Sequence, residues 1–187
     1  MIGQIKINIS ILLILLMAYS CGFYSLSGSL PPHIKTISIP MVENETAEFG
    51  IAENISDGIQ SRFNDEGILK VIDDNADSIL RGTVKKVTDG PYTYNKNESV
   101  SEYRYKIDVS IEWYDNKNEK TILKGNYSGW GAYGLSGDIS SDGIDNDNDG
   151  KIDSEDENEF GEPRLFASKV AVQKIAEDII NDIMTTW

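Results

Sequence analysis

The sequence predicts an α+β domain, a two-layer sandwich in which two helices pack on one face of a four-stranded, mostly antiparallel sheet. Two patterns indicate this class. Between residues 47 and 63, large apolar residues recur every four positions, as on the buried face of an amphipathic helix. Between residues 100 and 113, aromatic and β-branched residues alternate with polar ones, as in a half-buried strand.

The remaining elements follow from the same two periodicities and from the turn residues between them. We expect a strand, a helix that ends near Gly67, a short strand, three longer strands and a closing helix: residues 34–39, 47–63, 69–72, 79–87, 100–113, 121–130 and 164–184. Without the short strand at 69–72, the predicted sheet has four strands. Turns are expected at 89–91, which read Asp-Gly-Pro, and at 116–118.

Residues 1–20 are typical of a secretory signal. Lys6 precedes an apolar run from Ile9 to Ala18, which is shorter than the ~20 residues that span a bilayer. The cysteine that follows the run directly, Cys21, is the chain's only one and can form no intramolecular disulfide. The pattern therefore predicts a lipoprotein, cut before Cys21 and held on a membrane by acyl chains, palmitate among them, on that cysteine. An ordinary signal peptide with an incidental cysteine is the alternative.

The anchor is expected to continue into a tether at residues 21–33, rich in glycine, serine and proline, and then into the α/β domain at 34–187. Gly22 follows the cysteine where an aspartate would signal retention in the inner membrane, so an outer-membrane location is favoured. We expect the domain to face mainly the periplasm.

An acidic insertion at residues 138–162 carries much of the chain's net charge of −14. It holds eleven acidic residues against one lysine. Asp145, Asp147, Asp149, Asp153 and Asp156 fall at positions 1, 3, 5, 9 and 12 of an EF-hand-like loop, with Gly150 at position 6. The spacing also resembles the repeats of thrombospondin type 3 and predicts a structural Ca²⁺ site. A disordered acidic loop is the alternative.

The composition and motifs of the chain argue against nucleic-acid binding and against catalysis. No cluster of lysine and arginine is present to neutralise nucleic-acid phosphates, so nucleic acid is not expected as a partner. His33 is the only histidine and follows two prolines, and neither a G-x-S-x-G motif nor a P-loop is present, so we expect no enzyme. Residues 129–134 spell G-x-G-x-x-G but lead into the acidic insertion, and we interpret them as a turn.

Seven stretches of the chain together resemble the family of the lipopolysaccharide (LPS)-assembly lipoprotein LptE. They are residues 21–24, 30–40, 43–46, 77–84, 92–94, 102–104 and 176–180. The resemblance covers roughly 21–134 and 163–185, and the acidic insertion is not part of the family pattern. It implies a two-helix, four-stranded sandwich that plugs the outer-membrane barrel LptD, assists its assembly and helps to deliver LPS to the cell surface.

The function implied by the resemblance needs side chains that face a barrel wall or a lipid phosphate. Cations suit phosphate, and the candidates on predicted strands are Arg81, Lys85, Arg104 and Lys106. Lys85 and Lys86 are adjacent, so strict alternation would place them on opposite faces. The aromatic side chains could face a barrel or fill the core: residues 103–113, Tyr92, Tyr94, Tyr127 and Trp130.

Two other functions remain open from the sequence. One is a free-standing periplasmic binding module or activator lipoprotein. The other is a calcium-dependent adhesion or scaffold lipoprotein, in which the acidic insertion is the working part.

Overall fold

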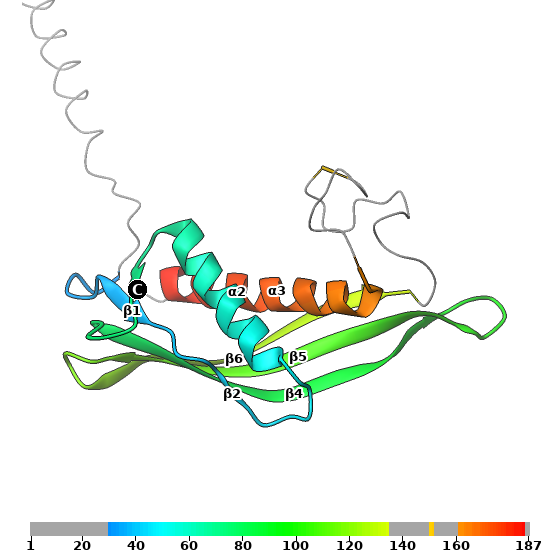
Figure 1. Cartoon of the computed structure of the whole chain (residues 1–187), viewed down its shortest axis with the longest axis horizontal. Coiled ribbons are helices and arrows are strands. Elements are labelled where there is room, and N and C mark those ends of the chain that lie inside the picture. Colours follow the sequence, from blue (N-terminus) through cyan, green and yellow to red (C-terminus); the bar gives the residue numbers. More distant parts are fainter. Residues whose placement is uncertain (1–29, 135–149, 152–160, 186–187) are drawn as a thin grey trace, which may run out of the picture.

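The computed structural model describes residues 30–134, 150–151 and 161–185, and shows two helices on one face of a mixed sheet (Figure 1). The elements in chain order are β1 (Thr36–Ser38), β2 (Glu43–Asn44), α2 (Ile51–Glu66), β3 (Lys70–Val71), β4 (Ser78–Tyr94), β5 (Val100–Asp115), β6 (Lys120–Tyr133) and α3 (Pro163–Thr185). The predicted α+β class is confirmed, and both predicted helices are present.

The predicted sheet of four mostly antiparallel strands is wrong. The sheet has six strands in the order β3-β1-β4-β5-β6, with β2 also paired to β4. β1 runs parallel to β3 and to β4, and β2 runs parallel to β4, whereas β4, β5 and β6 form an antiparallel meander. The short strands β1 and β3 lie within the predicted strands 34–39 and 69–72, whereas β2 was not predicted, because two residues are too few for periodicity to reveal.

The turn predicted at 89–91 is also wrong, because β4 continues through Gly90 and Pro91 to Tyr94. In the described part of the chain, no strand pairs with β4 beyond Val84 on the side away from β5. A proline, which lacks an N–H donor, is tolerated at such an edge. The long β4–β5 hairpin therefore extends past the helices (Figure 1).

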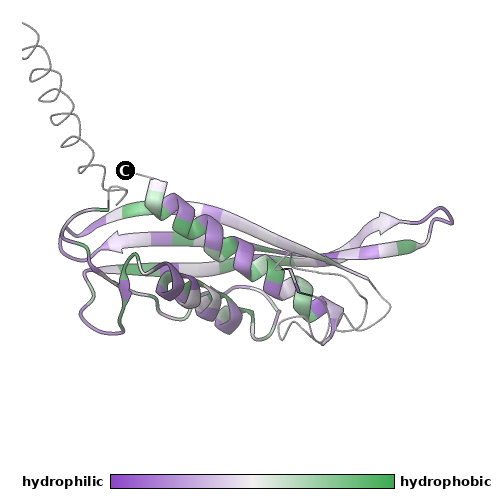
Figure 2. Ribbon diagram, turned by 90° about the horizontal axis from the view of Figure 1, so that it is seen from above, coloured by the Kyte–Doolittle hydropathy of each residue, from purple (hydrophilic) through white to green (hydrophobic). Residues whose placement is uncertain are grey.

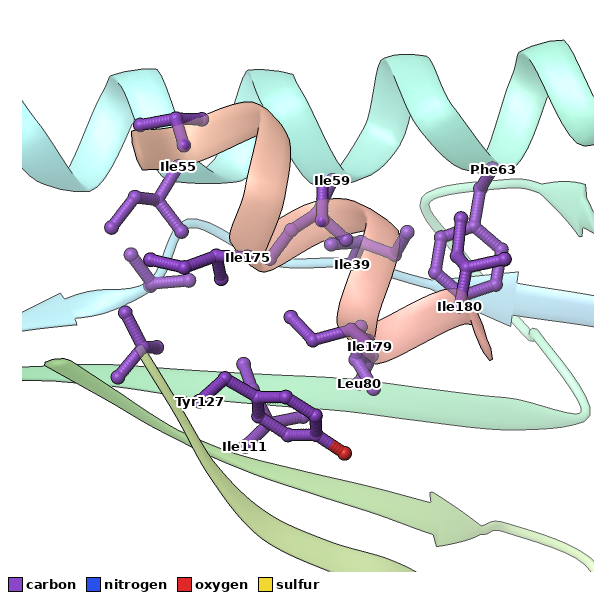
Figure 3. Close-up of a cluster of buried hydrophobic side chains, with 14 of the residues drawn as sticks. Ile39, Ile55, Ile59, Phe63, Leu80, Ile111, Tyr127, Ile175, Ile179 and Ile180 are labelled. Carbon is purple, nitrogen blue, oxygen red and sulfur yellow. The ribbon is translucent and has the colours of Figure 1, made fainter. Parts of the chain in front are cut away.

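The core lies between the sheet and the helix layer. Figure 3 shows side chains of α2 pointing toward those of α3, above the inner face of the sheet. The central members of this cluster are Ile55, Ile59 and Phe63 of α2, Ile175, Ile179 and Ile180 of α3, and Leu80, Ile111 and Tyr127 of the sheet. Every one of them is at most 7% exposed. Both helices carry hydrophilic residues between these apolar ones (Figure 2).

Both ends of α2 have left-handed glycines. Gly50 precedes the helix with φ 75°, and Gly67 ends it with φ 61° while its N–H donates to the carbonyl of Phe63. Glycine adopts this backbone conformation at little cost, which makes Gly67 the expected helix end. The predicted end of the helix at Gly67 is confirmed.

Candidate interaction surface

The outer face of the sheet, turned away from the helices, is where the sequence-predicted cations lie. Leu80, Val84, Ile107 and their neighbours point into the core, so the residues that alternate with them point outward. The meander β4–β6 contributes nine charged residues to this outer face: the cations Arg81, Lys85, Lys86, Arg104, Lys106 and Lys124, and the anions Glu102, Asp108 and Glu112. The meander's part of the face is therefore net positive on a chain whose net charge is −14, while Glu43 and Glu45 add two anions beside Thr83 and Lys85.

A β-bulge changes the geometry at Lys85. Val84 pairs with Val109 and Lys86 pairs with Asp108, so Lys85 is an extra residue in β4. Lys85 and Lys86 are both exposed, and Lys85 lines the same outer-face depression as Arg81. The expectation that these two lysines serve opposite faces is therefore wrong, because alternation fails at the bulge.

The four predicted cations do not form one site. Arg81 pairs with Glu112 and Arg104 with Gly90 in the strand register. Arg104 and Glu112 are eight residues apart on β5, or about 27 Å at a rise of about 3.4 Å per residue. The outer face therefore has a proximal part around Arg81 and a distal part around Arg104.

The proximal part is a depression of about 530 Å³ between β2 and the meander. Arg81, Lys85 and Lys124 contribute positive charge to it, and Glu43 and Glu112 contribute negative charge. The hydroxyl-bearing residues Thr83 and Ser110 also line it. The Lys85 ammonium is 2.6 Å from a carboxylate oxygen of Glu45. The guanidinium of Arg81 lies 5.5 Å from the ring centre of Tyr114, which leaves its N–H edge available to a ligand.

Lys124 was missed as a candidate from the sequence. It lies on β6 and pairs with Glu112, which pairs on its other side with Arg81. Lys124 is far from Arg81 in the sequence. The two residues come near each other because both pair with Glu112 in the antiparallel register. The strand pattern at 121–130 was the one available signal.

The distal part combines cations with aromatic rings. The guanidinium of Arg104 lies 4.9 Å from the ring centre of Tyr92 and 6.0 Å from that of Trp130. The ring centres of Tyr92 and Trp130 are 5.6 Å apart, with planes tilted by 55°. Lys106 is engaged beside them, its ammonium 2.8 Å from a carboxylate oxygen of Asp108.

Asp108 is held in its charged form by this arrangement. Burial raises the pKa of Asp108, but the bonds from Lys106 and from the hydroxyl of Ser128 outweigh burial and hold the pKa below its usual range. Lys106 is therefore bound to a permanent anion near neutral pH and is less available to an external phosphate than Arg104.

The aromatic side chains divide into a group that can face a partner and a group that fills the core. Tyr92, Tyr94 and Trp130 are 41%, 61% and 46% exposed and can face a partner. Tyr105, Trp113 and Tyr127 are buried and belong to the core. Alternation places Tyr127 and Trp130 of β6 on opposite faces of the sheet, whereas Tyr92 and Tyr94 belong to β4.

Arg164, at the start of α3, connects three elements on the helix side of the sheet. Its guanidinium makes two bonds of 3.0 and 3.2 Å to the carboxylate of Glu48 and one of 2.6 Å to Asp89 of β4. It also lies 4.8 Å from the ring centre of Tyr105. Bonds to Glu48 and Asp89 raise the pKa of Arg164 above its usual value. This anchor fixes the start of α3 directly after the acidic insertion.

His33 lies at the opposite end of the sheet, where the described chain begins. Its Nε2 is 2.7 Å from the carboxylate of Asp115, which is fully buried. The same carboxylate accepts backbone bonds from Lys117 and Asn118 and a side-chain bond from Asn118. This cluster fastens the segment that leads out of the predicted tether to the β5–β6 turn.

A second hollow, of about 600 Å³, lies between α2 and α3 and was not expected from the sequence. Its lining mixes charges of both signs, among them Asp57, Arg62 and Lys169. All the residues that line it belong to the two helices, so the sheet lies between it and the outer face.

Two predicted sites fall on residues that the structure does not describe. Cys21, the predicted lipidation site, is one, and the predicted calcium ligands Asp145, Asp147, Asp149, Asp153 and Asp156 are the other. Among residues 30–134, 150–151 and 161–185, no cluster of three or more histidine, cysteine or acidic side chains could hold a metal ion. No helix within the same ranges is long and apolar enough to cross a bilayer.

Comparison with known proteins adds a sequence family and a fold. A family model described as LptE, lipopolysaccharide-assembly, matches residues 34–187. No curated protein matches the sequence.

Among solved structures, the hypothetical protein CT253 from Chlamydia trachomatis has a TM-score of 0.52 at 11% identity, covering 81% of this chain and 96% of that one. Protein XCC0632 from Xanthomonas campestris has a TM-score of 0.50 at 9% identity, covering 83% and 88%. The rare lipoprotein B from Shewanella oneidensis has a TM-score of 0.35 at 12% identity, covering 55% and 72%. The first two share the fold of this chain.

Proposed function

The chain belongs to the LptE family of lipopolysaccharide-assembly proteins, and from that premise we propose that it plugs an LptD-type outer-membrane barrel, assists its assembly and supports delivery of LPS to the cell surface. The observation that carries this proposal is the family match over residues 34–187, which include every described helix and strand. The proposed role is that of a fitted partner without catalysis.

The architecture supports a plug. A plug needs a rigid body with one surface left open for the barrel wall, and here the helices cover only one face of the sheet (Figure 1). The open face presents Tyr92, Trp130 and Arg104, residue types enriched where proteins bind one another.

Anchoring on the outer membrane through acyl chains at Cys21 is part of the same proposal. A lipid anchor would keep the domain at the membrane that holds the barrel, with residues 21–33 as the tether. The His33–Asp115 contact supports this arrangement, because it fixes the point where the tether would meet the domain.

LPS is the proposed ligand of the cationic residues. Of the four predicted from sequence, Arg81 and Arg104 keep free guanidinium edges, while Lys85 and Lys106 have carboxylate partners. Lys124 beside Arg81 makes the proximal depression the best place for a phosphate group.

Co-purification tests the proposal. The tagged full-length chain is extracted from host outer membranes in mild detergent, and proteins that remain bound are identified by mass spectrometry. We expect an LptD-type barrel at a fixed ratio, and loss of membrane retention in the Cys21→Ser variant. A free-standing periplasmic module would instead purify without any barrel.

Calcium binding by the acidic insertion is a second proposed function, and one observation favours it. Gly150, at the loop position where EF-hands need a sharp turn, has φ 92°. The proposed ligands are Asp145, Asp147, Asp149, Asp153 and Asp156, and the proposed role of the ion is structural. As a scaffold or adhesion module the insertion would act beside the plug or in its place.

A further inference from the structure

Tyr92, Arg104 and Trp130 form an exposed cluster on the distal outer face. Tyr92 is 41% and Trp130 46% exposed, and neither belongs to the buried core. In the part of the chain that the structure describes, their rings contact each other and Arg104. Large aromatic side chains left in water on a regular sheet are costly, and a group of them marks an interaction site.

The backbone of β4 is irregular next to this cluster. The register of β4 against β5 shifts between Pro91 and Thr93, so Tyr92 is an extra residue at a second bulge. Tyr92 follows Gly90, the partner of the outward Arg104, by two residues, so alternation places it on the same face, and its ring meets that of Trp130, two strands away. Arg104 is flanked in the register by Gly90 and Ala132, whose small side chains leave the three large groups standing above the sheet.

The chemistry of the cluster suits a protein surface. Tryptophan, tyrosine and arginine are the residue types that dominate binding energy at the centres of protein interfaces. Arg104 has its hydrophobic plane on the rings and its N–H groups free, so it can donate to a carboxylate or to backbone carbonyls.

We propose that Tyr92, Arg104 and Trp130 are the energetic centre of the contact with the barrel partner, against an acidic stretch of that partner's wall. This inference rests on the proposed function. The sign of the partner's charge follows from the meander's outer face, where six cations outnumber three anions although the chain as a whole is acidic. The two further anions, Glu43 and Glu45, lie at the proximal part, away from this cluster. Complementary charge at an interface steers and orients the partner.

A glycolipid is the other occupant with matching charge, and the arrangement disfavours it here. A phosphate group calls for several converging cations, yet in the distal part Lys106 is bound to Asp108 and Arg104 is the one cation among the three clustered residues. The depression that gathers Arg81, Lys85 and Lys124 is about 27 Å away along the strands.

Binding measurements on four variants test the inference. The full-length lipidated chain and its barrel partner are purified in detergent, and the dissociation constant is measured for Trp130→Ala, Arg104→Lys, Lys106→Ala and the control Phe49→Ala. Phe49 is fully exposed and lies outside the outer face, so its truncation removes as much aromatic surface elsewhere. Binding of each variant to purified LPS is measured in parallel, and thermal unfolding verifies the fold.

We expect Trp130→Ala to weaken barrel binding at least tenfold and Arg104→Lys several-fold, because lysine keeps the charge but lacks the planar group. Phe49→Ala is expected to stay within about threefold of the wild type. Lys106→Ala removes a cation that pairs with Trp130 in the register and leaves Asp108 unpaired, so it is expected to weaken binding several-fold, as Arg104→Lys does. Unchanged barrel binding by Trp130→Ala overturns the inference and leaves the plug standing. Loss of LPS binding with barrel binding intact assigns the cluster to the glycolipid instead. A wild-type chain that binds no barrel rejects the proposed function itself.

Discussion

Asp115 shows how one buried carboxylate can hold two distant parts of the chain. Burial alone raises the pKa of Asp115, but bonds from Asn118, His33 and Lys117 outweigh it, and the pKa falls to about 2. A carboxyl group with a lowered pKa stabilises the folded state above its unfolded pKa of about 4, and this contribution is lost as the pH falls toward 2.

We therefore predict that Asp115→Asn lowers the free energy of unfolding at neutral pH by about 1–3 kcal/mol, the cost of disrupting a buried hydrogen-bond network. The difference from the wild type should shrink as the pH is lowered from about 4 to about 2. Urea unfolding at several pH values measures it. The exposed Asp74, changed to Asn, is the control and should have little effect at any pH. A difference that stays constant with pH would contradict the proposed ionisation.

Predictions for single residues are confirmed where inward and outward side chains alternate strictly along a strand. The alternation in 103–113 correctly separates the buried Tyr105 and Trp113 from the outward Arg104 and Lys106. It fails at the two bulges, where Lys85 and Tyr92 are inserted. A bulge depends on the partner strand, so a single strand's pattern cannot reveal it.

At the scale of elements, the glycines of β6 determine how closely α3 can approach the sheet. Gly129 and Gly131 lie on the inner face of the strand, and the interpretation of 129–134 as a turn is wrong. A Cβ on Gly129 would overlap the backbone carbonyl of Ala171, and one on Gly131 would overlap that of Ala167. The sequence contains a sign of this close packing: Gly129 and Gly131 are two residues apart on the strand, and Ala167 and Ala171 are four apart on the closing helix.

We predict that Gly131→Ala lowers the free energy of unfolding by about 3 kcal/mol, because the added methyl must push a helix backbone away from the strand. Gly134→Ala is the matched control, since its added Cβ would meet nothing within 4 Å. Chemical denaturation of both variants measures the effect. Equal stabilities for the two would show that α3 does not pack on β6 as described.

At the scale of the whole molecule, the sequence predicted the α+β class and the placement of both helices on one face, because the longer elements carry clear periodicity. The two-residue strands β2 and β3, and the parallel pairing of β1, depend on contacts between segments far apart in the chain. The proximal depression on the outer face arises from that pairing, so its full set of cations was not predictable.

The acidic insertion is the most highly charged segment of the chain, with eleven acidic residues against one lysine. We predict that the full-length protein, freed of metal by a chelator, binds Ca²⁺ with a Kd on the order of 10⁻⁴–10⁻³ M, as in extracellular modules. Isothermal titration with CaCl₂ measures this. Asp145→Asn combined with Asp149→Asn should abolish the binding, while Asp57→Asn on α2 should not. Binding that persists in the double variant would exclude the proposed ligands.

The central claim is that this chain supports delivery of LPS to the cell surface as the partner of a barrel. Depletion of the protein in its host, with newly made LPS at the cell surface as the readout, tests that claim most directly. The account predicts that surface LPS falls as the protein is depleted and recovers when the wild-type chain is supplied again. Normal LPS export after complete depletion would contradict it.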